Sequence, residues 1–281
     1  MNEKSLILLF NTTCNLNCKY CFMKSIENYN EYNSNISICD SIINILSYRN
    51  DIIHLLITGG EPFVNTNNLI YFLDKINQLN LSIRYNDPIF VKIITNGTIY
   101  TKELKNYSYF IELQISVDGY KNNHNKNRRD YDLIKENAIK YKNDGFNLSI
   151  NSVIDNPFEF EKNINKFIED FNFVQKIGVH YRYDIIKKYR RNIILDIIYY
   201  IKFLSIIKKY KLNHLLDVGL CSIIKNVVSI DMNNGNIFAC YMQILDKKFG
   251  SIGKIQNNRI FVDENKLIIY EKILDNKIEY D

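Results

Sequence analysis

The sequence contains no tryptophan, only 3 prolines and no long uninterrupted hydrophobic run. Met1 to Lys4 are polar and do not provide the apolar core of a secretory signal peptide. The most apolar helical stretch, residues 193–207, is interrupted by Asp196 and Lys202 and is too short to cross a membrane. These absences argue against a secreted or membrane-spanning protein, and we expect a cytoplasmic one without a membrane partner.

The composition is that of an ordinary globular chain. With 281 residues, 46% hydrophobic and 24% charged, it can form one large domain, or one domain with a small appendage. The net charge of +5 is spread along the chain, so no dedicated nucleic-acid surface is expected. A weakly basic surface is also compatible with an acidic peptide partner.

Three of the six cysteines are clustered, at Cys14, Cys18 and Cys21. The polar residues between them suit a loop better than one buried helix face. A zinc site would need a fourth ligand, which does not follow at zinc-finger spacing, and disulfides are not expected in a cytoplasmic chain. Three thiolates can instead hold three irons of a cubane iron-sulfur cluster and leave the fourth iron open to a substrate.

Short apolar runs alternate with longer amphipathic ones from residue 5 to about 183. Such alternation predicts βαβ units, a parallel sheet and an α/β fold that closes into a partial (β/α)6 TIM-like barrel. The expected strands are 6–10, 52–58, 90–95, 112–117, 148–154 and 177–182. The expected helices are 37–48, 66–79, 101–109, 131–144 and 158–171.

Polar and glycine-rich segments follow four of these strands. In parallel βα units such segments share one rim of the sheet. Each segment alone could be an ordinary βα turn, but four on one rim favour a binding site. They are Thr58–Pro62, Thr95–Gly97, Ser116–Gly119 and Asn151–Asp155, and the cysteine cluster follows the first strand.

The CxxxCxxC spacing, followed by the aromatic Phe22, resembles the signature of the radical S-adenosylmethionine (SAM) superfamily. The resemblance implies a 4Fe–4S cluster held by Cys14, Cys18 and Cys21, and SAM bound at the open iron. It also implies an external electron donor such as flavodoxin or ferredoxin. One electron from the cluster would cleave SAM to methionine and a 5'-deoxyadenosyl radical.

The same resemblance implies which residues contact SAM. Gly59-Gly60-Glu61 looks like the family's GGE motif, which binds the SAM amino group, and Phe22 matches the aromatic residue next to the adenine. The strand ends that follow match the positions that face methionine and ribose. The implied cofactor-binding set is Phe22, Gly59, Gly60, Glu61, Asn96, Ser116, Asp118, Asn151 and Arg128.

Asp118-Gly119 followed by His124 and Arg128 resembles a segment of the branch that modifies peptides and proteins. Asn125 replaces the usual aspartate of that segment, which weakens a base or amine-binding role for it. Arg128 could bind a carboxylate of SAM or of a peptide, or belong to a solvated basic loop. His124 could be structural or catalytic.

The last part of the chain predicts a small α+β extension. A helix at 192–210 precedes two strands, 227–231 and 237–241, around an Asn-Gly turn. We therefore divide the chain into a radical SAM barrel, 1–190, and an extension, 191–281. The spacing of Cys221, Gly235 and Cys240 resembles the first half of a SPASM or twitch extension.

An all-cysteine auxiliary cluster needs four ligands, and no cysteine follows Cys240. Cys221 and Cys240 could use unusual ligands, be the remnant of a lost site, or donate a hydrogen atom to a substrate radical. The expected function is hydrogen abstraction from a ribosomally made peptide or small protein, leading to a crosslink, an epimer or a dehydrogenated residue. The alternatives are a small-molecule substrate and a catalytically silent peptide-binding subunit.

Overall fold

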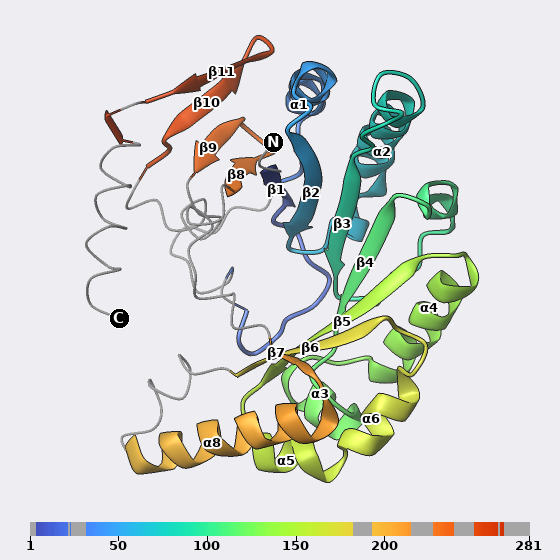
Figure 1. Cartoon of the computed structure of the whole chain (residues 1–281), viewed down its shortest axis with the longest axis vertical. Coiled ribbons are helices and arrows are strands. Elements are labelled where there is room, and N and C mark those ends of the chain that lie inside the picture. The colour runs from blue at the N-terminus through green and yellow to red at the C-terminus, as the bar shows by residue number, and fades with distance from the viewer. Residues whose placement is uncertain are drawn as a thin grey trace. The chain divides into compact units, whose positions relative to one another are not determined.

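We describe the protein from a computed structural model that covers residues 4–21, 23, 32–181, 193–214, 227–238, 250–263 and 265–266 (Figure 1). The chain forms two compact units. The first comprises residues 1–15, 23–93 and 220–281, and the second comprises residues 16–22 and 94–219. The predicted domain boundary near residue 190 lies outside the described residues.

Strand β1, Lys4–Asn11, is the central strand of the first unit. It pairs in parallel with β2, Ile52–Gly59, on one side and with β8, Val227–Asp231, on the other. Strand β2 pairs in parallel with β3, Phe90–Thr95. The strand order in this unit is β11-β10-β9-β8-β1-β2-β3, so β1 is not an edge strand.

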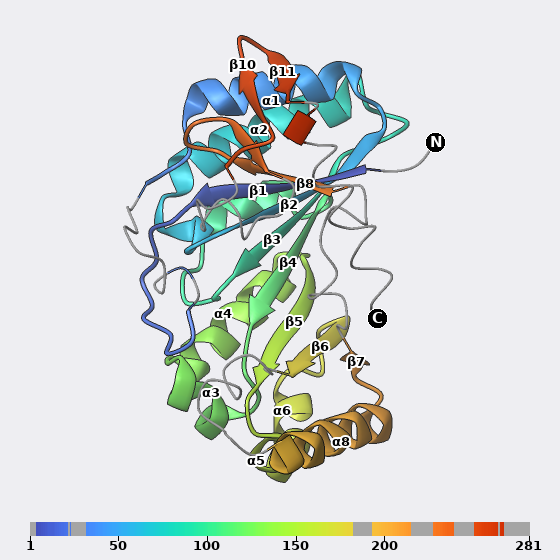
Figure 2. The same cartoon turned by 90° about the vertical axis from the view of Figure 1, so that its left-hand side faces the viewer.

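Two amphipathic helices, α1 (Ile36–Tyr48) and α2 (Thr66–Leu81), cover one face of these strands (Figure 2). The Asn35 side chain caps α1 by accepting a hydrogen bond from the Ser37 amide. Both helices bury apolar residues at helical spacing, which forms the core of this unit. The fully buried ones are Cys39, Ile42, Ile45 and Leu46 on α1, and Leu69, Phe72, Leu73 and Ile76 on α2.

The predicted hairpin in the C-terminal part is confirmed for its described residues. Strands β8 and β9 (Asn236–Phe238) pair antiparallel around Gly235, whose φ of 75° suits a glycine in a tight turn. Sequence analysis did not predict the next hairpin, β10 (Gly253–Gln256) with β11 (Arg259–Val262). Apolar and polar residues alternate only weakly in these two strands, and all four residues of β11 are exposed, so the sequence carries little strand signal there.

The second unit contains the parallel strands β4 (Ile111–Ser116), β5 (Asn147–Ile154), β6 (Lys176–Tyr181) and β7 (Asn213–His214). Its helices are α3 (Lys121–Asn127), α4 (Tyr131–Asn143), α5 (Pro157–Lys162), α6 (Ile164–Asp170) and α8 (Ile193–Tyr210), with a 3-10 helix at Lys102–Tyr107. Helices α4, α5, α6 and α8 lie on one face of the strands (Figures 1 and 2).

The two faces of β4 differ in chemistry. Ile111, Leu113 and Ile115 are buried, whereas Glu112 and Gln114 are half-exposed on the other face. A Cβ atom on Gly97 would lie 2.7 Å from Ile115 and 3.0 Å from Ile134 of α4, so the apolar face is the one under the helices. The opposite face of β4 is polar.

Two predicted helices are corrected. The pattern at 158–171 forms two short helices, α5 and α6, because Asn163 leaves the helical conformation with a φ of −124°. The pattern at 101–109 forms a 3-10 helix rather than an α-helix. Both segments still bury their apolar side chains, among them Leu104, Phe160 and Phe167.

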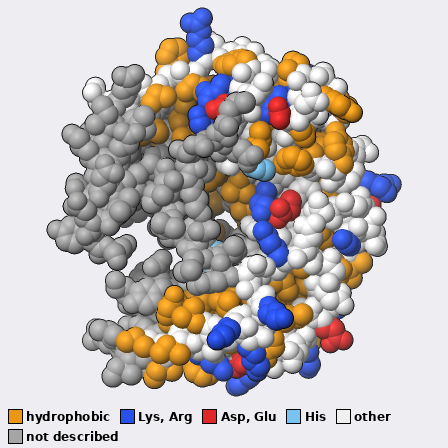
Figure 3. All heavy atoms as spheres, viewed as in Figure 1, with side chains coloured by type: hydrophobic (Ala, Val, Ile, Leu, Met, Phe, Trp, Pro, Cys, Tyr) orange, Lys and Arg blue, Asp and Glu red, His pale blue; other side chains and the backbone are white. Residues whose placement is uncertain are grey.

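Helix α8 has an apolar outer surface. Ile197, Ile201 and Leu204 are exposed at helical spacing, whereas Phe203 and Ile206 are buried. Figure 3 shows hydrophobic side chains gathered over this helix at the lower left. Even so, none of the described helices is long and apolar enough to span a membrane.

The α/β prediction is confirmed by the alternating elements and parallel pairing. Among the described strands, β11 of the first unit and β7 of the second each have one hydrogen-bonded neighbour, so neither unit closes a barrel by itself.

Candidate functional site

The cysteine loop follows β1 directly. Cys14, Cys18 and Cys21 are half-buried and form no disulfide, and the Cys21 amide donates to the Cys18 carbonyl oxygen at 3.2 Å. Burial raises the pKa of the Cys18 thiol, and the nearby positive charge of Arg128 opposes that shift. Cys14 belongs to the first unit and the other two belong to the second. Phe22 lies outside the described residues.

The donor set suits a cluster rather than a single metal ion. Among the described residues, no three His, Cys, Asp or Glu side chains are grouped so as to hold one ion. A cubane does not require such a group, because each thiolate binds a different iron. Three reduced, partly accessible thiols at a spacing of four and three residues therefore fit a 4Fe–4S cluster with one open iron.

The GGE motif packs its backbone against the end of β1. The Gly60 amide donates to the Asn11 carbonyl oxygen at 3.0 Å, and the Glu61 amide donates to that of Thr13 at 2.9 Å. The Asn11 side-chain amide in turn donates a 2.8 Å hydrogen bond to the Glu61 carbonyl oxygen. Hence the motif is fixed to the segment that leads into Cys14.

Close packing explains both glycines of this motif. A Cβ atom on Gly59 would lie 2.2 Å from the Asn11 carbonyl oxygen, and one on Gly60 would lie 2.3 Å from that of Thr13. Glu61 is fully buried, and its carboxylate accepts a 3.1 Å bond from the Phe63 amide, which caps a 3-10 helix at Pro62–Val64. The motif therefore has a structural role within the first unit.

We expect Gly60→Ala to destabilise the protein by about 3 kcal/mol, because the atoms that the methyl group meets are backbone and cannot move aside cheaply. Gly145→Ala is the control, since its Cβ would meet only the Ser108 hydroxyl oxygen, at 3.6 Å. The φ of 91° at Gly145 adds about 1 kcal/mol of backbone strain to the control, without any steric overlap. Equal urea midpoints for the two variants would contradict the packing argument.

Neighbouring strand ends bring two predicted SAM contacts together in the second unit. Ser116 at the end of β4 is in register with Asn151 on β5. The Asn151 side-chain oxygen is buried and accepts no hydrogen bond. A buried acceptor without a donor is costly, so it fits a ligand that supplies an O–H or N–H group, as the ribose of SAM does.

Asn96, at the end of β3, has a local role in the structure. Its side-chain oxygen accepts bonds from the Thr98 amide at 2.9 Å and from the Thr98 hydroxyl at 2.7 Å. This Asx turn shapes the loop after β3.

Asp118 and Arg128 bind each other. Arg128 Nε donates to Asp118 Oδ2 at 3.0 Å, and the Val153 amide donates to Asp118 Oδ1 at 3.1 Å. The Tyr20 hydroxyl, from the cysteine loop, also donates to Asp118 Oδ2. Sequence reasoning missed Tyr20; its one signal was a hydroxyl-bearing ring between two of the three clustered cysteines.

His124 is a fully buried residue of α3. Its Nδ1 accepts a bond from the Asp118 amide at 3.1 Å, so Nε2 carries the proton that faces the Arg129 carbonyl oxygen at 3.0 Å. Burial lowers the pKa of His124, which favours the neutral ring that this pattern requires. The side chain of Asn125 accepts a 3.2 Å bond from the Tyr131 amide at the start of α4. These contacts support a structural role for both residues.

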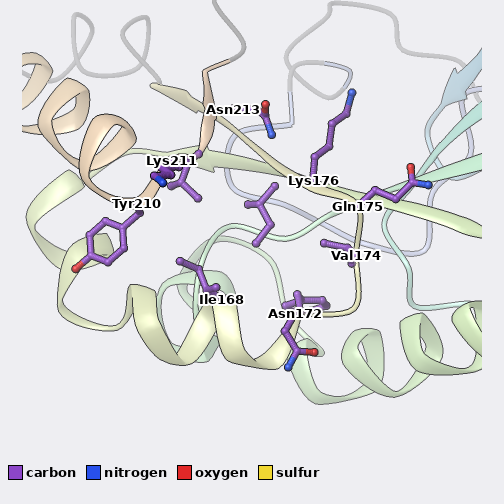
Figure 4. Close-up of a pocket in the computed structure, with 11 residues that line it drawn as sticks. Ile168, Asn172, Val174, Gln175, Lys176, Tyr210, Lys211 and Asn213 are labelled. Atoms are coloured by element: carbon purple, nitrogen blue, oxygen red, sulfur yellow. The ribbon is translucent and has the colours of Figure 1, made fainter.

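A cavity of about 240 Å³ lies at the opposite, amino-terminal end of β6 (Figure 4). Its lining comes from the ends of α6 and α8 and the starts of β6 and β7, with Asn172, Lys176, Tyr210 and Asn213 among the labelled residues. It contains none of the predicted site residues. Cys221 and Cys240 lie outside the described residues, so the auxiliary site stays a prediction.

Known proteins resemble this chain in sequence and in fold. It is 30% identical over 200 residues to the radical SAM cyclopropyl synthase TigE of Paramaledivibacter caminithermalis. The match covers 63% of this chain and 41% of TigE, so the chain spans about two fifths of that relative.

Two solved structures show the same fold. The structure of anSMEcpe with bound AdoMet matches with a TM-score of 0.70 and 20% identity, over 91% of this chain and 75% of that one. Streptococcus suis SuiB bound to precursor peptide SuiA matches with a TM-score of 0.63 and 16% identity, over 87% of this chain and 61% of that one.

The family profile decides the assignment. The profile described as the radical SAM superfamily matches residues 8–170, which is more than half of the chain and includes the cysteine loop, the GGE motif and strands β1 to β5. This chain therefore belongs to the radical SAM superfamily, whose enzymes use a 4Fe–4S cluster and S-adenosylmethionine.

Proposed function

We propose that this protein cleaves S-adenosylmethionine reductively and abstracts a hydrogen atom from a peptide or small protein. The observation that carries the proposal is the triplet of half-buried cysteines at Cys14, Cys18 and Cys21, none of which forms a disulfide. The family profile covers both their loop and the GGE motif, and the backbone of the motif is hydrogen-bonded to the segment just before Cys14. When bound, the cluster supplies the electron that splits SAM into methionine and a 5'-deoxyadenosyl radical, and an external flavodoxin or ferredoxin replaces that electron.

The chain's own residues bind and orient SAM in this proposal. Gly59, Gly60 and Glu61 present the motif that faces the SAM amino group. Ser116 and Asn151 supply hydroxyl and amide groups on adjacent strands, and the unsatisfied Asn151 oxygen accepts a hydrogen bond from a SAM hydroxyl. Strands β4 and β5 hold Ser116 and Asn151 in register, so the part of SAM that they bind has one orientation.

A peptide substrate is supported by the polar face of β4. Glu112 and Gln114 of β4 are half-exposed there, and the Ser149 hydroxyl of β5 donates to Glu112 at 2.6 Å. Donors and acceptors of this kind match the amide groups of a peptide backbone. SuiB, which shares the fold, has been solved with its precursor peptide SuiA.

The test is 5'-deoxyadenosine release from anaerobically reconstituted protein given SAM and dithionite. We expect release by the wild type and none by a variant with alanine at Cys14, Cys18 and Cys21. Adding a peptide that is encoded beside the gene should then increase the release of 5'-deoxyadenosine. The peptide itself should show an altered mass by mass spectrometry. Release that no peptide stimulates, together with stimulation by a small metabolite, would contradict the peptide assignment.

A further inference from the structure

Residues 16–21 of the cysteine loop are tied to α3 and to the end of β4 within the second unit. The Lys19 amide donates to the carbonyl oxygen of Asn127, the last residue of α3, at 3.0 Å. The neighbouring Tyr20 hydroxyl donates to Asp118 Oδ2 and accepts a 2.8 Å bond from Arg128 Nε. We call Tyr20, Asp118 and Arg128 the loop anchor.

The loop anchor is buried and charge-neutralised. The side chains of Asp118 and Arg128 are 1% and 13% exposed, and their ion pair is 3.0 Å long. The Arg128 guanidinium also lies over the Tyr20 ring, 5.3 Å from its centroid. Removing one partner of such a pair leaves a buried charge without compensation, so the three side chains support one another.

The contacts of the loop anchor give two predicted SAM-binding residues a further role. Asp118 accepts bonds from Tyr20, Arg128 and the Val153 amide, so its carboxylate is engaged on both oxygens. The Nε of Arg128 is engaged by Tyr20 and Asp118. Both side chains are therefore bound to the cysteine loop.

We propose that Tyr20, Asp118 and Arg128 are positioning residues that hold Cys18 and Cys21 in the arrangement that the cluster needs. Tyr20 stands between these two cysteines in sequence, so fixing its ring fixes the turn that carries both thiols. Arg128 binds both Tyr20 and Asp118, so losing its charge alone would leave the Asp118 carboxylate uncompensated beside the loop. A negative charge there disfavours the more negative, reduced cluster and lowers its reduction potential. This inference rests on the proposed function, because it assigns the loop to a cluster.

Tyr20→Phe, Arg128→Met and Arg128→Lys test the anchor, with Arg129→Met as the matched control. The Arg129 side chain is 60% exposed and pairs with Asp130, so its loss should change nothing measured here. The readouts are iron per chain after anaerobic reconstitution and gel filtration, the midpoint potential of the cluster by redox titration, and the SAM dissociation constant of the loaded fraction.

We expect Arg128→Met to lose at least about half of its iron, with a more negative potential in the cluster that remains and SAM affinity within about twofold of wild type. Arg128→Lys should keep the potential but lose iron, because a lysine cannot reproduce the planar, stacked contact. Tyr20→Phe retains the ring and loses only the hydroxyl, so it should fold and lose iron to a smaller extent.

Wild-type iron content and potential in both Tyr20→Phe and Arg128→Lys would overturn the proposal. A loss of SAM affinity alone in the Arg128 variants would assign Arg128 to SAM instead. Should Arg128→Met fail to fold by circular dichroism, Tyr20→Phe decides. A wild-type protein that binds no cubane would refute the proposed function itself, which separates that failure from a failure of the anchor.

Discussion

Cys18→Ala is expected to abolish SAM cleavage while leaving the fold intact. Cys18 is half-buried in a loop, so its sulfur contributes little to the core, yet its loss leaves only two thiolates for the cluster. The measurement is 5'-deoxyadenosine release by the reconstituted protein, together with iron content and a thermal melt.

Cys39→Ala is the matched control for this prediction. Cys39 is fully buried on α1, and burial raises the pKa of its thiol to about 12, so it stays protonated and is a poor ligand. Its replacement should cost about 1 kcal/mol of stability and leave cleavage unchanged. Cleavage at the wild-type rate by Cys18→Ala would refute the cluster assignment.

Arg84→Met is expected to cause the largest loss of stability, about 4 kcal/mol. The Arg84 side chain is buried and donates to four backbone carbonyl oxygens, of Leu46, Arg49, Ile52 and Asp87, at 3.0 to 3.1 Å. Leu46 and Arg49 lie at the end of α1, where carbonyl groups lack helical partners and attract a positive charge. Methionine would remove a donor from each of the four carbonyl oxygens, and the Arg49 oxygen would keep only its 3.3 Å bond from the Ile52 amide.

Urea unfolding of the apo-protein measures this loss. The control is Arg49→Met, because the Arg49 side chain is 38% exposed and pairs with Asp51 at 2.8 Å. A surface pair of this kind contributes about 0.5 kcal/mol. Similar unfolding free energies for the two variants would show that Arg84 does not hold the end of α1 to β2.

The sequence predicted strands with strong apolar patterns very well. The bounds of β3 and β8 match the expected residues, because their turns and apolar runs leave little choice of register. Helix bounds were less predictable where a single polar residue decides whether a helix continues or ends. Asn163 divides α5 from α6, and the pattern of buried phenylalanines continues across it without a sign of the break.

Tertiary contacts of polar side chains were not predictable in the same way. A buried arginine such as Arg84 contradicts the usual preference of charged side chains for the surface, and its carbonyl partners carry no sequence signal. Likewise, the motif that contains Asp118 indicated a ligand contact, whereas the bond to Tyr20 depends on a fold that brings the cysteine loop to the end of β4. Motif spacing predicts chemistry, but it does not predict which groups a carboxylate contacts.

The parallel pairing of β1 with β8 has a consequence for biosynthesis. Residues 5 to 9 contact residues 227 to 231, so this pairing closes a loop that includes most of the chain. Contacts between such distant residues form late and slowly. During translation, one edge of β1 therefore remains unpaired until residue 231 has emerged from the ribosome. Only then can β1, the strand that leads into the cysteine loop, pair with β8 as its second neighbour.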